Sequence, residues 1–77
     1  MKKTYVAVIA QFSVTGEITP LSITWRDGRE FPIDRILGQE RAASIRAGGI
    51  GMRYHIRIGE TETYLWYEEP AWFVEEK

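Results

Sequence analysis

Residues 21–33 of this chain read LSITWRDGREFPI, and their pattern indicates the fold class. Apolar Leu21, Ile23 and Trp25 alternate with polar neighbours, which is the two-residue period of a half-buried strand. Asp27 and Gly28 follow at once, and this pair is typical of a hairpin turn. A second strand therefore returns antiparallel to the first.

The length of this hairpin loop sets which side chains face each other, because a slip of one residue turns a strand inside out. A two-residue loop would mix the apolar and polar faces of the two strands. A three-residue loop over 26–28 places Ile23 opposite Phe31 and keeps one apolar face. We therefore predict the three-residue loop, with Gly28 in the left-handed conformation at a bulge.

The same period runs through most of the chain, with no linker, repeat or low-complexity segment. Apolar residues alternate along 6–14 and 52–58, and β-rich runs follow at 63–67 and 72–74. Residues 39–46 are ambiguous: their propensities suit a helix, but they lack an apolar stripe. We favour a strand for them.

Pairing of the C-terminal strands follows from keeping one apolar face continuous. We predict Ile58 opposite Thr63, across a turn over 59–62. We predict a second turn with Pro70 in its first central position, which brings Tyr67 opposite Trp72. The aromatic residues expected inside are Trp25, Phe31, Tyr54, Tyr67 and Trp72.

The predicted fold is all-β, with about six short antiparallel strands in a single domain over residues 1–77. An open flat sheet would leave long reactive edges, so we expect a small curled sheet or an SH3-like barrel. We expect the first strand to pair with the last.

Composition excludes several classes of site. The chain has no cysteine, so disulfides and thiolate metal sites are absent, and its one histidine cannot build an all-histidine metal site. We expect no metal, no cofactor and no catalytic residues, because His55 has no evident nucleophile or orienting carboxylate. The apolar run 5–10 is shorter than a secretory or membrane segment requires, so we expect a cytoplasmic protein.

Charge is nearly balanced but unevenly distributed. The chain holds 10 Lys and Arg against 11 Asp and Glu, for a net charge of −1. Basic residues prevail over 36–57 and acidic residues over 58–77. This balance argues against bulk attraction to nucleic acid, although it permits a local basic patch.

One local patch follows from the predicted register, on the face opposite the core. It comprises Arg53, His55, Arg57, Tyr64, Trp66 and Phe73. Flat rings interleaved with basic groups suit single-stranded nucleic acid, whose bases stack while its phosphates meet guanidinium groups. Three interpretations remain open: a covered, structural face, a protein contact, and a nucleic-acid site.

A glycine-rich segment precedes the 52–58 run and contains Gly48, Gly49 and Gly51. Backbone amides in such a segment can cradle a phosphate, but the Lys-Ser/Thr pair of a P-loop is missing. We predict a flexible hairpin loop there.

Five segments follow one another in a recognisable order: Trp25 to Arg29, Ile33 to Arg35, Arg41 to Ser44, Gly48 to Tyr54 and Trp72 to Glu75. This order resembles that of a group of short uncharacterised bacterial proteins of unknown function. The resemblance covers about residues 20–76, implies a small mostly-β domain and implies no activity.

These observations predict a small non-enzymatic binding or protein-interaction module. A short chain without disulfides gains core area by self-association, so we expect a protein partner or a second copy, through a strand edge or the patch. The alternative is a single-stranded nucleic-acid-binding β-barrel that uses the patch.

Overall fold

The computed structural model describes residues 2–43 and 50–76, and every regular element in these ranges is a β-strand. The all-β prediction is confirmed. There are seven strands instead of about six, because residues 39–43 of the ambiguous stretch belong to a strand of their own, as favoured. Residues 44–46 of that stretch lie outside the described residues. The strands are β1 (Lys2–Phe12), β2 (Ile18–Thr24), β3 (Glu30–Pro32), β4 (Arg35–Ala43), β5 (Ile50–Ile58), β6 (Thr61–Glu68) and β7 (Ala71–Glu76).

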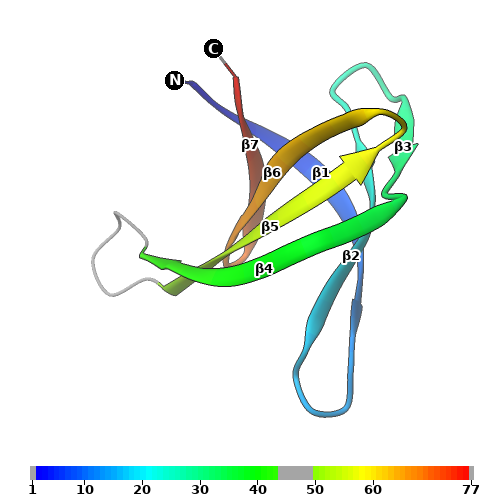
Figure 1. The fold of residues 1–77 in the computed structure, drawn as a ribbon. Coiled ribbons are helices and arrows are strands. Elements are labelled where there is room, and N and C mark those ends of the chain that lie inside the picture. The colour runs from blue at the N-terminus through cyan, green and yellow to red at the C-terminus, as the bar shows by residue number, and fades with distance from the viewer. Residues whose placement is uncertain (1, 44–49, 77) are drawn as a thin grey trace.

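The seven strands form one antiparallel sheet in the order β3-β2-β1-β7-β6-β5-β4, which curls strongly into a half-barrel (Figure 1). The first strand pairs with the last, as expected: Thr4 of β1 lies opposite Val74 of β7. The two ends of the chain therefore lie side by side, and the Thr4 hydroxyl donates a hydrogen bond to Glu76.

The chain itself joins the two edges of the curled sheet at one point. The Ile33 amide donates to the Leu21 carbonyl of β2, at 2.9 Å. The next amide, that of Asp34, donates to the Arg57 carbonyl of β5, also at 2.9 Å. Residues 33 and 34 thus carry the chain from the β3 edge to the β4 edge, which holds the sheet in its curled form.

The β2–β3 hairpin has the predicted geometry. The Trp25 amide donates to the Arg29 carbonyl at 2.8 Å, which closes a loop of three residues. Gly28 has a φ of +89°, in the left-handed region that glycine adopts without a steric penalty. Ile23 lies opposite Phe31, as the choice of loop required.

The hydrophobic core occupies the inner, concave face of the sheet. Its buried members are Ile23, Tyr54, Ile56, Leu65, Trp72 and Val74. The predicted inward residues Trp25 and Tyr67 are half-buried against it. Phe31 is half-buried but lies outside this cluster, at the short β3 edge, with the Arg29 guanidinium over its ring at 5.5 Å.

Two details of the C-terminal hairpins correct the prediction. Ile58 pairs with Thr61, not Thr63, because Gly59 at a φ of +60° permits a tight two-residue turn. Tyr67 does pair with Trp72, but Pro70 takes the second central position of its turn and follows a cis peptide bond.

Within the ranges that the structure describes, no helix has the length and apolar character needed to cross a membrane.

Candidate functional site

The six residues of the predicted patch do share the outer face of the sheet, on β5, β6 and β7. The register of β5 and β6 differs from the prediction by two residues, and a two-residue shift leaves every side chain on its face. The cross-strand neighbours change, however. Arg53 lies opposite Trp66, His55 opposite Tyr64, and Arg57 opposite Glu62.

Ring and guanidinium contacts hold this face together. Trp66 and Phe73 are stacked, with ring centroids 5.8 Å apart and planes 2° from parallel. The Arg53 guanidinium lies 4.6 Å from the centre of the Tyr64 ring and 5.6 Å from that of Trp66. His55 stacks on Tyr64 at 4.9 Å. Such contacts stabilise a sheet surface without any ligand.

The prediction that Phe73 is available on the surface is wrong, because its side chain is only 2% exposed. Two residues of β1 cover it: the Tyr5 ring contacts it edge-on at 5.7 Å, and the Lys3 ammonium lies 4.6 Å from its centre. Trp66 covers another side, and its own Nε1 is buried without a hydrogen-bond partner among the described residues. Phe73 is therefore buried among side chains of the outer face instead of being exposed there.

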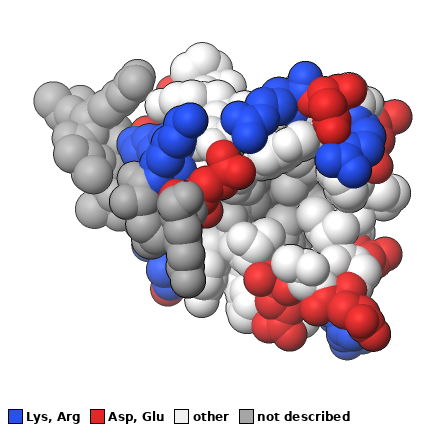
Figure 2. Space-filling view, turned by 90° about the horizontal axis from the view of Figure 1, so that it is seen from above, with Lys and Arg blue, Asp and Glu red and all other residues white. Residues whose placement is uncertain are grey.

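Carboxylates accompany the basic groups of this face. Lys3 pairs with Glu68 at 3.7 Å, Arg53 pairs with Glu40, and His55 Nε2 lies 3.1 Å from Glu62. In the space-filling view from above, basic and acidic side chains adjoin one another (Figure 2). A polyanion would have to displace these partners before it gained the guanidinium groups.

The glycine-rich segment does not contribute as predicted. Gly51 is buried within β5, where it pairs with Glu68 and Ala42, so it does not belong to a loop. Gly48 and Gly49 lie outside the described residues.

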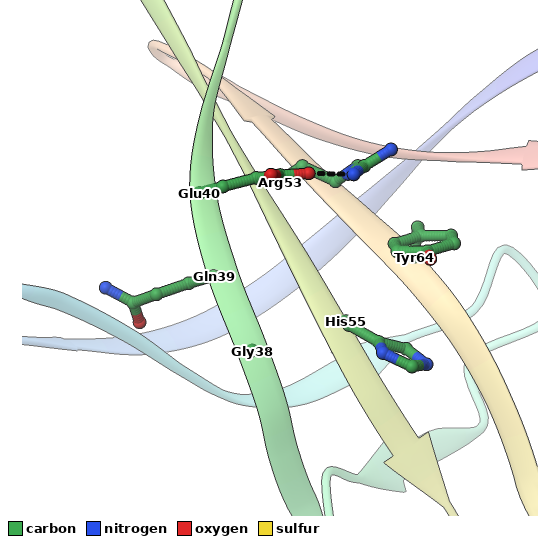
Figure 3. A pocket seen from close by; sticks show the side chains of 6 residues that line it. All are labelled: Gly38, Gln39, Glu40, Arg53, His55 and Tyr64. Atoms are coloured by element: carbon green, nitrogen blue, oxygen red, sulfur yellow. Dashed lines mark ion pairs between the residues drawn. The ribbon is translucent and has the colours of Figure 1, made fainter.

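A hollow of about 250 Å³ lies beside the patch, at the outer strand β4 (Figure 3). Its lining residues are Gly38, Gln39, Glu40, Arg53, His55 and Tyr64. Gly38 faces His55 across the ladder and offers no side chain, and a Cβ placed on it would meet nothing within 4 Å. The Glu40–Arg53 ion pair borders the hollow at one end, and Gln39 points away from it (Figure 3).

Sequence reasoning missed this hollow. The sequence feature that could have indicated it is Gly38, an isolated glycine in a strand, because such a glycine marks a bulge or a close approach of another backbone. The β4–β5 register does shift between Ile36 and Gly38.

The outer edge of β4 is the second feature of this site. β4 is the last strand of the sheet and spans nine residues, and within the described chain no other strand pairs with its free side (Figure 1). The opposite edge, β3, has three residues and ends in Pro32, which protects it against pairing. Leu37 on β4 is 40% exposed.

The charges along β4 are incompletely matched within the chain. Glu40 meets Arg53 across the ladder, but Arg35 lies opposite Arg57, a pair of like charges. Like charges directly opposite each other destabilise a strand pair. Arg57 directs its Nε to the Gly59 carbonyl, at 3.1 Å.

Among residues 2–43 and 50–76, no three His, Asp or Glu side chains gather in a way that would hold a metal ion. Asp34 serves instead as a turn cap, since its carboxylate accepts a hydrogen bond from the Gly59 amide.

Comparison of the chain with protein-family models, with curated proteins and with solved structures finds no match.

Proposed function

We propose that this chain is a small, non-enzymatic protein-interaction module that binds an extended segment of a protein along the free edge of β4. The observation that carries the proposal is the coincidence of this nine-residue edge with the hollow over Gly38. In strand addition, main-chain hydrogen bonds supply affinity and pockets for alternate side chains supply specificity. The β4 edge offers the main-chain hydrogen-bonding groups, and the hollow offers a pocket for a side chain.

The walls of the hollow indicate what an added strand would place there. His55 and Tyr64 offer the faces of two stacked rings, and the Glu40–Arg53 pair offers a charged rim. A side chain with apolar surface would lie over Gly38 against the rings, as aromatic or branched residues do over glycines in sheets. The residues assigned to binding are therefore Arg53, His55 and Tyr64, together with Gly38 and Glu40.

Selection from a displayed library of short extended peptides tests this function. We expect enriched peptides whose addition to the labelled protein shifts the backbone amide resonances of residues 35–41. The amides of 30–32, on the protected β3 edge, are the internal control and should not move. At concentrations where the chain is monomeric, enrichment of no peptide, or shifts confined to other strands, would count against the proposal.

Single-stranded nucleic-acid binding is a second candidate function. The contact of Arg53 with both Tyr64 and Trp66 favours it, because bases could stack beside a guanidinium group. The carboxylates that pair with Lys3 and Arg53 oppose it. Titration with oligonucleotides at low salt, followed by tryptophan fluorescence, tests this function. A quench that added salt reverses supports nucleic-acid binding, and the absence of a quench excludes it.

A further inference from the structure

We propose that the segment bound along β4 is the β4 strand of a second copy of the chain, so that the two half-barrels form a two-fold dimer. The two strands run antiparallel, and Arg35 of each copy faces Glu40 of the other. The inference rests on the proposed use of the β4 edge and names its partner.

The faces of β4 restrict the register of such a pair. Ile36 and Gln39 lie opposite the inward residues Ile56 and Tyr54, whereas Arg35 and Glu40 lie opposite outward residues of β5. The bulge between Ile36 and Gly38 reverses the alternation once along the strand. A partner strand must therefore reverse at the same place.

A second copy of β4 meets this condition, because it carries the same bulge. When Ile36 faces Gln39 of the other copy, Arg35 faces Glu40, and inward residues meet inward residues on both sides. The two bulges then lie opposite each other at the centre of the pair. A bulge and charges protect an edge from indiscriminate pairing, so an arbitrary strand without them fits less well.

Charge selects this register over its neighbours. Arg35, which meets only Arg57 across the ladder, gains a carboxylate from the other copy, and the two-fold axis makes this contact twice. A shift by two residues leaves Arg35 facing Gly38 in one direction and Ala42 in the other. A shift by one residue turns inward side chains against outward ones.

At the centre of the pair, an exposed leucine meets a glycine. Leu37 of one copy lies opposite Gly38 of the other, where the space above the glycine is open. The exposed leucine would be covered by this contact, which contributes apolar burial at the axis. The protected β3 edge prevents further addition, so the assembly closes at two copies.

The test is sedimentation velocity of the full chain from micromolar to millimolar concentration, with charge-reversed variants. We expect a concentration-dependent dimer. Arg35→Glu should raise its dissociation constant by about tenfold or more, because two attractive contacts become repulsive. Arg26→Glu makes the same charge change in the β2–β3 loop and should leave the dimer intact.

Mixing two variants tests the register itself. Arg35→Glu and Glu40→Arg should each dimerise poorly alone, yet associate when mixed, because both cross-copy contacts are then attractive. Thermal melts of the separate variants show that each is folded. Failure of the folded variants to associate on mixing would overturn the register.

The outcomes separate this inference from the proposed function. A chain that stays monomeric at millimolar concentration but binds peptides along β4 overturns the dimer and leaves the function standing. A dimer insensitive to Arg35→Glu also overturns the inference. A monomer that binds no peptide overturns both, whereas slower amide exchange over 35–41 on dimerisation supports both.

Discussion

Tyr54 joins distant parts of the curled sheet through a single side chain. It lies in β5, is 1% exposed and packs against Trp72, with ring centroids 5.7 Å apart. Its hydroxyl donates a hydrogen bond of 2.8 Å to the Ile18 carbonyl at the start of β2. The contact spans the concave face, so the residue contributes both apolar burial and a polar contact between strands that are not neighbours in the sheet.

Tyr54→Phe tests the value of that hydrogen bond. The change keeps the ring but leaves the Ile18 carbonyl without its donor, so we expect the free energy of unfolding to fall by about 1–3 kcal/mol. Urea denaturation measures it. Tyr64→Phe is the matched control, because Tyr64 is 43% exposed, and should change stability by less than about 0.5 kcal/mol. Equal losses in the two variants would contradict the assigned role.

The same residue makes stability depend on alkaline pH. Burial raises the pKa of Tyr54 above its ordinary value of 10.0, with a smaller contribution from Tyr67, whose own pKa is also raised by burial. The unfolded state therefore loses these protons first. We expect stability contributed by these groups to be complete below pH 10.0 and to fall as pH rises above it. Urea midpoints should decline less steeply in Tyr54→Phe, and an unchanged slope would contradict this origin.

At the scale of elements, turns decide how the strands pair. The three-residue loop before β3 could be chosen from sequence because the alternative mixed the two faces. The length of the β5–β6 turn could not be chosen from sequence, because pairing Ile58 with Thr61 or with Thr63 leaves the same side chains on each face. The positive φ of Gly59 in the folded hairpin distinguishes the two registers.

Gly28→Ala tests the role of the β2–β3 loop. A side chain at a φ of +89° meets a steric penalty that glycine avoids, so we expect a loss of about 1–2 kcal/mol in unfolding free energy. Gly38→Ala is the matched control: Gly38 has no positive φ and the space beside it is open. That variant should be as stable as the parent or more stable by up to about 1 kcal/mol. Thermal melts at a concentration that keeps the chain monomeric measure the stability of both variants. A Gly38→Ala variant less stable than Gly28→Ala would contradict this role of Gly28.

At the scale of the whole molecule, one curled sheet encloses one core. Leu65, fully buried in β6, belongs to this core and lies opposite Tyr54 of β5. A chain of 77 residues has few such side chains, so each carries a large share of the apolar burial. The free energy of unfolding therefore depends on a small number of buried side chains.

Leu65→Ala should remove about 2–5 kcal/mol of unfolding free energy, because it deletes buried methyl groups and leaves a cavity. In so small a chain this loss is a large part of the total. Leu37→Ala, at the exposed edge, should leave the monomer's urea midpoint unchanged within about 0.5 kcal/mol. A small effect of Leu65→Ala would mean that the core repacks or lies elsewhere.

The strands, the faces that their side chains take and the length of one loop follow from local sequence patterns. Residues 52–58 alternate strictly, so Tyr54 and Ile56 had to share the core while Arg53 and His55 faced outward. Asp27-Gly28 defined the adjoining turn, because loop length and glycine conformation act within a few residues of the chain. Local signals of this kind need no knowledge of distant strands.

The exposure and the ion pairs of the outer face depend on segments that are distant in sequence. Phe73 is buried because Tyr5 and Lys3 arrive from the other end of the chain, and Arg53 is paired because β4 brings Glu40 beside it. The free edge of β4 and the hollow over Gly38 likewise follow from strand order. Strand order depends on which distant segments meet when the sheet curls. The two-residue period shows which face each side chain takes, but it does not show which strands are neighbours.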